Sequence, residues 1–341
     1  MPALLPLTIT DIREEAPGFR TITFAERLPY AAGQFLTFEA RLGGQTVRRS
    51  YSLLSSPAFD EPLTIGVRRI ANGIFSRHLF ENIHPGDQLW TAGATGRFQL
   101  PPDDAPPATL FFFAAGTGIT PVLSLLRTAL ATRPRWRALL VYSSHDRSDA
   151  LFLPLLQQLA ADHPRAFTLH LLFSTDPNLR RARLNRPLLL ELLQAAGART
   201  AADWFYTCGP ENYMRLCTFV LRTEGVPANR LRREDFLPAP APPPPAHPGL
   251  QPRAVTVETR EGSAVVTVVP PETILKAALR AGLSLPWSCA AGRCGACTAR
   301  CASGHVWMAR NEVLTDADLE KGLVLTCTAF PLDDGVRILT Y

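Results

Sequence analysis

The sequence lacks any long hydrophobic run, although hydrophobic residues occupy 46% of its 341 positions. Its longest apolar run covers residues 110–115 and ends at Gly116, whereas a helix needs about 18 apolar residues to cross a bilayer. Residues 1–10 also lack a basic stretch followed by an apolar segment, so no signal peptide is expected. We therefore expect a cytoplasmic protein with no membrane span.

The sequence also lacks a concentrated basic stripe. The net charge is +5, but residues 253–341 contain nine basic and nine acidic residues, so the excess belongs to residues 1–252. The excess is dispersed there, and its densest run is residues 180–183. Nucleic-acid binders usually present a basic stripe with interleaved aromatic residues. Nucleic acid is therefore not an expected partner.

Cysteines are few and unevenly placed. The chain has seven, an odd number that excludes a fully paired disulfide framework, and five of them lie from Cys289 to Cys327. In a cytosolic chain, clustered cysteines hold metal more often than they form disulfides. The C-terminal cysteines are therefore candidate metal ligands.

Proline, in contrast, is abundant, and eight of the 31 prolines lie in residues 238–252. Polyproline has no internal hydrogen bonds and cannot pack a core, so this segment is predicted to link two domains. A long surface loop within one domain is the alternative, but such loops are uncommon. The sequence leaves open whether the linker is a hinge or a fixed spacer.

Two patterns follow each other before this linker. Up to about residue 100, short strands alternate with turns, which is typical of an antiparallel barrel or sandwich. The strands expected there are 7–12, 19–24, 34–40, 49–55, 63–69 and 88–91. After the prolines of residues 101–107, strands alternate with helices, which predicts a parallel sheet covered by helices, the usual frame of a nucleotide site.

The ranges of these elements can be read from the hydrophobic pattern. In the second region we expect strands 110–115, 138–143, 167–173 and 204–208, and helices 122–131, 151–161, 188–196 and 213–221. After the linker we expect strands 254–259 and 264–269, a helix over 274–281, and then the cysteine loop. The predicted domains are an antiparallel β domain (1–103), an α/β domain (104–237), the linker (238–252) and a small domain that contains the cysteine loop (253–341).

The cysteine loop has a specific spacing, C-x4-C-x2-C followed by a distant fourth cysteine. The four residues are Cys289, Cys294, Cys297 and Cys327. Plant-type ferredoxins hold a [2Fe–2S] cluster with this spacing, because two irons need four thiolates. Gly292 and Gly295 would let the backbone curl close to the cluster sulfurs.

Two alternatives accompany this interpretation. Zinc is one, although zinc sites typically use paired C-x2-C knuckles and only one such pair occurs here. Cys301 is the other, since it lies close by and could compete as a ligand. Because Cys301 lies outside the pattern, we expect a small buried hydrophobic residue there instead.

A glycine turn joins the strand at 110–115 to the next helix. Gly116, Thr117 and Gly118 form the turn, Thr120 is expected to cap the helix, and Pro121 suits its first turn. A helix N-terminus placed this way can bind a pyrophosphate. The motif is not the dinucleotide fingerprint G-x-G-x-x-G, because Pro121 takes its last place. A plain turn is the alternative.

A second motif ends a later strand at the same carboxyl edge of the sheet, where ligands bind in open α/β folds. It consists of Cys208, Gly209 and Pro210. The alternative for Cys208 is an ordinary core thiol, which is also what we expect of Cys217.

The first region contains a candidate cofactor strand. It carries Arg49, Ser50, Tyr51 and Ser52. Alternation places the arginine and the tyrosine on one face and the two serines on the other. The arginine can neutralise a phosphate, the tyrosine ring can stack, and a serine hydroxyl can bond a ring nitrogen. Gly73 and Ser76, before a predicted helix, offer a second phosphate contact. An ordinary strand and cap are the alternative.

These motifs in this order resemble the ferredoxin–NADP reductase superfamily, in the branch with a plant-type ferredoxin domain at its C-terminus. The resemblance covers nearly the whole chain, and residues 49–57 and 113–121 carry most of it. The reductase components of phenylacetyl-CoA epoxidase and 3-ketosteroid 9α-hydroxylase look similar, as do hybrid-cluster-protein reductases. The expected fold is therefore an antiparallel β-barrel flavin domain, an α/β parallel-sheet NAD(P) domain and a β-grasp-like ferredoxin domain.

The resemblance also implies residue roles. The flavin would be held by Arg49 at its pyrophosphate, Tyr51 on its ring, Ser52 near N5, the adjacent Ser50, and Gly73 and Ser76 at phosphate. The nicotinamide dinucleotide would be held by Gly116, Thr117, Gly118 and Pro121, with Cys208, Gly209 and Pro210 facing the nicotinamide. Glu234 and Phe236 would lie near the flavin, and Ser52, Cys208 and Glu234 are the implied catalytic residues.

The implied activity is electron transfer from NAD(P)H through FAD to the [2Fe–2S] cluster and on to a terminal oxygenase or another electron-acceptor protein. FMN is a less expected flavin, used by a related class that resembles phthalate dioxygenase reductase. Asp146 favours NADH and the nearby Arg147 favours NADPH, so both donors remain open with a lean to NADH. The alternatives are a reductase of another redox partner, such as hybrid cluster protein, and a redox-sensing module without turnover.

Overall fold

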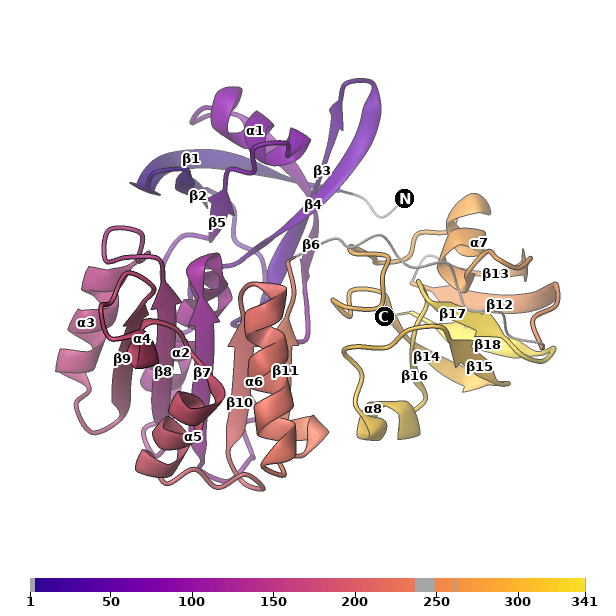
Figure 1. Ribbon diagram of the computed structural model, residues 1–341. Coiled ribbons are helices and arrows are strands. Elements are labelled where there is room, and N and C mark those ends of the chain that lie inside the picture. Colours follow the sequence, from indigo (N-terminus) through magenta and orange to yellow (C-terminus); the bar gives the residue numbers. More distant parts are fainter. Residues whose placement is uncertain (1–3, 237–248, 261, 341) are drawn as a thin grey trace. The chain divides into compact units, whose positions relative to one another are not determined.

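The computed structural model describes residues 4–236, 249–260 and 262–340. These residues form two compact units, one comprising Leu5–Asp235 and the other beginning at Phe236 (Figure 1). Residues 238–248, which make up most of the predicted linker (238–252), lie outside the described residues. No helix among the described residues combines the length and apolar character needed to span a membrane.

The first region of the larger unit is a six-stranded antiparallel sheet with the order β4-β3-β6-β1-β2-β5. Its strands are β1 (Leu5–Ala16), β2 (Phe19–Phe24), β3 (Phe35–Leu42), β4 (Gln45–Ser52), β5 (Thr64–Arg68) and β6 (Gln88–Thr95). A bridge between Leu53, just after β4, and Ile65 of β5 joins the two ends of this order. The sheet thereby closes on itself, which confirms the predicted antiparallel barrel.

Several strands of the barrel have other ends than those expected, and β4 differs from its expected range at both ends. The hydrophobic pattern predicted a strand over 49–55, whereas β4 is Gln45–Ser52 and forms a hairpin with β3. Its polar first half has no hydrophobic alternation, so the pattern could not reveal it. Gly43 and Gly44 form the two-residue turn, with φ of 55° and 78°, which is the geometry that a tight hairpin requires.

The second region is a parallel five-stranded sheet with the order β11-β10-β7-β8-β9. Its strands are β7 (Thr109–Ala115), β8 (Arg137–Ser144), β9 (Phe167–Phe173), β10 (Trp204–Cys208) and β11 (Leu231–Glu234). Its helices are the short η1 (Gly116–Gly118), α2 (Ile119–Thr132), α3 (Leu153–Asp162), α4 (Leu179–Ala182), α5 (Arg186–Ala195), α6 (Glu211–Thr223) and the short η2 (Ala228–Arg230).

Both faces of this sheet are covered by helices. Phe112 of β7 packs in one core with α2 and α3, while its neighbours Phe111 and Phe113 pack in a second core with α5 and α6. Successive side chains of a strand point to opposite faces, so a continuous apolar strand serves both cores. The predicted helix-covered parallel sheet is confirmed.

The smaller unit contains a mixed five-stranded sheet with the order β13-β12-β18-β14-β16 and a two-stranded sheet of β15 and β17. Its elements are β12 (Arg253–Thr259), β13 (Gly262–Val268), α7 (Ile274–Arg280), β14 (Thr298–Ser303), β15 (Val306–Met308), α8 (Asp316–Glu320), β16 (Leu323–Leu325), β17 (Ala329–Pro331) and β18 (Val336–Leu339). Helix α7 packs on this sheet through Ile274 and Leu275 in one hydrophobic core. The arrangement agrees with the expected β-grasp-like fold.

A buried carboxylate fixes the start of β7 to the turn before β10. Asp203 accepts hydrogen bonds from the backbone N–H of Thr109 (2.9 Å), the backbone N–H of Arg199 (2.7 Å) and the Arg199 guanidinium (3.0 Å). Its side chain is only 1% exposed, so solvent cannot replace these bonds.

Replacing this carboxylate should destabilise the parallel-sheet region. Asp203→Ala leaves buried N–H groups without an acceptor, which costs about 3 kcal/mol of unfolding free energy. Asp203→Asn keeps one oxygen acceptor and should lose less. Urea unfolding of both variants beside the parent protein measures the difference; equal midpoints for all three proteins would contradict the assignment.

Candidate active site

Strand β4 brings the predicted flavin residues together with the loop before α1 (Ile74–Glu81). The Tyr51 ring lies 6.3 Å from the ring of Phe38 and 6.1 Å from that of Phe75, measured between centroids. Phe75 belongs to the segment of Gly73 and Ser76, so the two parts predicted to bind flavin are neighbours. Burial raises the pKa of the Tyr51 hydroxyl, which keeps it neutral, and the charge of Arg49 offsets part of this increase.

The two serines of β4 differ in their surroundings. The Ser50 hydroxyl lies 2.9 Å from that of Thr37 on the paired strand. Ser52 is 4% exposed, and its hydroxyl has no hydrogen-bond partner among the described residues. A buried hydroxyl without a partner is costly and calls for an explanation such as a missing ligand. This orphaned group fits a flavin that supplies its partner.

Gly73 and Ser76 form a compact turn at the start of α1. The Ser76 hydroxyl accepts from the Ile70 N–H (3.1 Å) and donates to the Gly73 carbonyl (3.3 Å). A Cβ on Gly73 would lie 2.5 Å from the Ser76 oxygen, so this close turn requires glycine. The backbone N–H groups of the first helical turn are the donors available to a phosphate there.

The two motifs that were predicted to bind the nucleotide pack directly against each other at the carboxyl edge of the parallel sheet. A Cβ on Gly118 would lie 2.1 Å from the Cys208 carbonyl oxygen, and a Cβ on Gly209 would lie 2.9 Å from the Cβ of Ala115. Gly116 has φ of 54°, the left-handed region that favours glycine. The glycine turn therefore has a structural requirement for its residues as well as an open face.

One sequence prediction in this turn is wrong. Thr120 was expected to cap α2, but Gly118 occupies the cap position and no side chain bonds there. The Thr120 hydroxyl lies within the first turn and donates to the Thr117 carbonyl (2.9 Å). The short η1 (Gly116–Gly118) extends directly into α2, which moves the helix start before the threonine.

Two of the implied catalytic residues are register partners. In the parallel pairing of β10 with β7 and β11, Cys208 lies beside Ala114 on one side and Glu234 on the other. Cys208 is fully buried, and burial followed by the nearby charges of Glu234 and Asp235 raises its pKa, so it is a neutral thiol. Pro210 is the cap residue of α6, and Phe236 is 43% exposed.

The end of β8 carries an ionised carboxylate. Asp146 accepts from the Ser148 hydroxyl (2.7 Å) and from the backbone N–H groups of Ser148 (2.8 Å) and Asp149 (3.0 Å). These hydrogen bonds lower the pKa of the Asp146 carboxyl. The negative charge lies at the same carboxyl edge as the nucleotide motifs.

In the smaller unit, sheet pairing brings distant cysteines together. Thr298 of β14 pairs with Leu325 of β16, and the N–H and hydroxyl of Thr326 donate to the Cys297 carbonyl (3.2 and 3.1 Å). Cys297 and Cys327 therefore lie side by side, and a hydrogen bond between them followed by burial raises the pKa of Cys297.

The other two cysteines form a second pair. The Cys294 thiol donates a hydrogen bond to the Cys289 sulfur. This hydrogen bond, assisted by backbone N–H groups, lowers the pKa of Cys289, although burial opposes the decrease. Backbone N–H groups of Ala291 and Ala296 point at the two sulfurs, at 3.4 and 3.5 Å. N–H dipoles around thiolates suit a cluster that carries negative charge, so the predicted ligands fit a [2Fe–2S] group.

The loop conformation agrees with the glycine argument. Gly292 and Gly295 have φ of 73° and 71°, and a Cβ on Gly292 would lie 2.8 Å from the Arg310 carbonyl oxygen. Among the described residues, no three His, Cys, Asp or Glu side chains group as a site for one metal ion. Two cysteine pairs shared between two irons are a different arrangement.

The remaining cysteines have ordinary surroundings. Cys301 lies on β14 and packs against the core, but it is half-buried rather than buried as expected, and its thiol donates to the Ser303 carbonyl (3.3 Å). Cys217 is fully buried in the core beside α5 and α6, as expected.

The sequence did not identify the support of the cysteine loop. Arg293 is 9% exposed, and its Nε lies 3.4 Å from a Glu312 oxygen, while the Glu312 N–H donates to the Gly292 carbonyl (3.0 Å). Nothing in the local sequence pairs these residues, because only the fold brings the two segments together.

Comparison with known proteins agrees with this architecture. Three family models match the chain: an oxidoreductase FAD-binding domain over residues 16–100, an oxidoreductase NAD-binding domain over 112–218, and a 2Fe-2S iron-sulfur cluster binding domain over 258–332. The chain therefore contains domains for FAD, for NADH or NADPH and for a [2Fe–2S] cluster.

Relatives match over nearly the full length. The chain is 33% identical to the ferredoxin reductase component of 3-ketosteroid-9-alpha-monooxygenase from Mycolicibacterium smegmatis, over 98% of this chain and 96% of that one. It is 31% identical to one of the subunits of 1,2-phenylacetyl-CoA epoxidase from Escherichia coli, over 97% and 96% of the two chains.

Solved structures share the fold. Phthalate dioxygenase reductase is similar over 99% of this chain and 97% of its own, with a TM-score of 0.58 and 22% identity. An intact type IV self-sufficient cytochrome P450 monooxygenase is similar over 98% of this chain but only 41% of its own, with a TM-score of 0.74 and 23% identity. The chain thus belongs to the family of oxidoreductases that join FAD-binding, NAD-binding and 2Fe-2S domains in one ferredoxin reductase polypeptide.

Proposed function

We propose that this chain is the reductase component of an oxygenase system, passing electrons from NADH or NADPH to a separate oxygenase protein. The whole-length similarity to reductase components of monooxygenases carries this proposal. The structure supports it with an orphaned buried hydroxyl on β4, a nucleotide edge in the same unit, and two cysteine pairs in the smaller unit.

In the larger unit, Arg49 would neutralise the flavin pyrophosphate, Tyr51 would stack on the ring, and Ser52 would donate to N5. Ser50 supports the strand through Thr37, and the turn of Gly73 and Ser76 would present backbone N–H groups to phosphate. Bound FAD would accept two electrons from NADH or NADPH and pass them to the cluster one at a time.

At the sheet edge, Gly116, Thr117, Gly118 and Pro121 would bind the dinucleotide. The backbone at Gly209 and Pro210 would lie along the nicotinamide, with the neutral Cys208 thiol beside it and Glu234 one strand away. Phe236 is proposed near the flavin on the resemblance alone. In the smaller unit, Cys289, Cys294, Cys297 and Cys327 would ligate the irons.

Two finer assignments follow from charge and cysteine chemistry. The ionised Asp146 at the end of β8 would repel a 2′-phosphate, so NADH is the proposed donor. None of the seven cysteines, all of which lie among the described residues, forms a disulfide, and this supports a reducing, cytoplasmic location.

Reduction of the purified protein tests the function directly. Anaerobic NADH should bleach the flavin absorbance, after which the cluster absorbance should fall and an oxygenase or another one-electron acceptor protein should be reduced. NADPH should act more slowly. Loss of flavin colour with no onward transfer would indicate a redox-sensing module, and an unchanged flavin spectrum with either donor would refute the reductase.

The buried Ser52 hydroxyl gives a second test. Ser52→Ala removes a hydrogen bond aimed at the reacting ring, so the limiting rate of flavin reduction should fall about 10- to 100-fold while FAD remains bound. Thr46→Ala, on the exposed start of the same strand, is the matched control and should leave the rate unchanged. Stopped-flow absorbance measures both, and equal rates for the two variants would argue against a role for Ser52.

Cluster ligation gives a third test. Cys297→Ser should remove most of the bound iron and abolish reduction of cytochrome c, because single-electron transfer passes through the cluster. Reduction of ferricyanide directly from the flavin should persist. Cys301→Ser is the control, and it should keep both the iron content and the cytochrome c activity. Iron loss in the Cys301 variant would instead make Cys301 a ligand.

A further inference from the structure

Helix α2 belongs to the parallel-sheet region but packs along the barrel. At its first turn, a Cβ on Gly66 of β5 would lie 2.9 Å from the Thr120 Cγ2 atom. Further along, a Cβ on Gly33 would lie 2.9 Å from a Leu125 methyl carbon. The helix whose N-terminus follows the nucleotide turn is therefore also the helix that faces the flavin domain.

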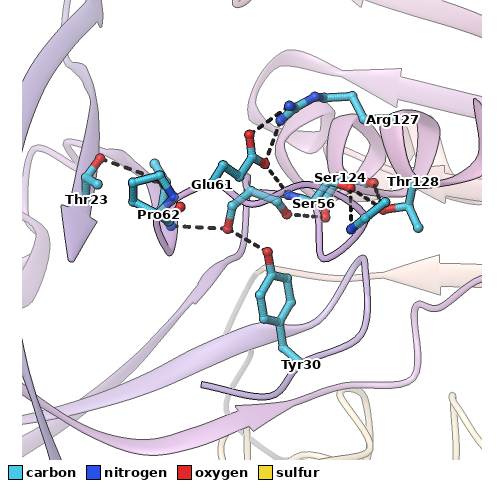
Figure 2. Close-up of polar contacts among 11 residues, drawn as sticks. Thr23, Tyr30, Ser56, Glu61, Pro62, Ser124, Arg127 and Thr128 are labelled. Atoms are coloured by element: carbon cyan, nitrogen blue, oxygen red, sulfur yellow. Dashed lines mark hydrogen bonds and ion pairs between the residues drawn. The ribbon is translucent and has the colours of Figure 1, made fainter. Parts of the chain in front are cut away.

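An ion pair joins this helix to the segment that follows β4, the strand with the predicted flavin residues. Arg127 donates to both oxygens of Glu61, at 2.9 and 2.8 Å, and Figure 2 shows the two groups facing each other. The Glu61 carboxylate also accepts from the Ser56 N–H at 2.5 Å. The side chains are only 20% and 25% exposed, so solvent screens this pair less than a surface pair.

Neutral hydrogen bonds beside the ion pair hold the same two segments. The Ser124 hydroxyl donates to the Ser55 carbonyl (2.6 Å), and the Ser56 and Thr128 hydroxyls lie 2.7 Å apart. All of these serine and threonine side chains are buried. Residues 53–56 thus continue from the flavin strand directly into a buried polar contact with α2.

We propose that Glu61 and Arg127, with the buried hydroxyls of Ser56 and Thr128, are positioning residues that set the distance between flavin and nicotinamide. This inference rests on the proposed function. Ser52 lies at the end of β4, four residues before Ser56, and the Gly116–Gly118 turn lies at the start of α2. The ion pair and the hydrogen bond between these two segments hold the flavin site and the nicotinamide site at a fixed separation. The rate of hydride transfer depends steeply on the alignment of the two reacting groups.

The test uses the full-length protein loaded with FAD. Glu61→Gln keeps the side-chain shape but removes the charge and one acceptor, so the limiting rate of flavin reduction in single-turnover mixing should fall about tenfold. FAD content and the dissociation constant of the nucleotide should not change, because neither residue belongs to the binding motifs. Amide hydrogen exchange of residues 53–60, measured without nucleotide, should become faster.

Asp60→Asn is the matched control. It removes the same charge from the neighbouring position, but its partner Arg27 lies within the barrel domain and both side chains are largely exposed. This variant should keep the parental reduction rate and exchange pattern. A second variant, Arg127→Lys, keeps the charge but loses the bidentate contact, so its rate decrease should be smaller. It takes the place of Glu61→Gln in the test if Glu61→Gln does not fold.

Different outcomes would contradict the positioning role and the reductase function. A folded Glu61→Gln or Arg127→Lys protein with a lower melting temperature but an unchanged limiting rate would show a purely structural pair and overturn the positioning role. A parent protein whose flavin is not reduced by NADH or NADPH would instead overturn the proposed function, whatever the variants do.

Discussion

The close approach of two backbone segments at the carboxyl edge of the parallel sheet is the constraint on which the reductase unit depends. Gly118 touches the Cys208 carbonyl, and Gly209 touches Ala115, with no room for a Cβ at either glycine. The parallel pairing of β7 with β10 brings these segments together. The other side of the glycine turn is open, because a Cβ on Gly116 would meet no atom within 4 Å. It lies at the edge where ligands bind in open α/β sheets.

Helix α2 extends this constraint to the flavin domain. Its first turn follows the glycine turn, its middle packs against the barrel at Gly33, and Arg127 near its end bonds Glu61. Rigid elements position reacting groups better than loops do, because packing locks them along their whole length. One helix therefore contacts both the antiparallel barrel and the parallel sheet, which belong to the FAD-binding and the NAD-binding domains.

The smaller unit holds four cysteine thiols as two neighbouring pairs without a disulfide. Pairing of β14 with β16 aligns Cys297 with Cys327, and the tight loop at Gly292 aligns Cys289 with Cys294. Backbone N–H groups around the sulfurs stabilise thiolate charge, and the ion pair of Arg293 with Glu312 holds the loop from outside.

Local patterns in the chain predicted the antiparallel and the helix-covered parallel sheet, most strand and helix positions of the larger unit and the cysteine spacing, because these depend on periodicity and short motifs. The β-grasp-like fold of the smaller unit was expected from the family resemblance alone. They missed the polar first half of β4, the edge strand β11 and the strands β14 to β18 of the smaller unit. They also placed Thr120 as a cap, since the entry through η1 leaves no hydrophobic signal. Only the tertiary structure showed that the Ser52 hydroxyl is buried without a partner and that Glu61 pairs with Arg127. Burial and pairing of this kind depend on segments that lie far apart in the chain, and no local sequence pattern encodes them.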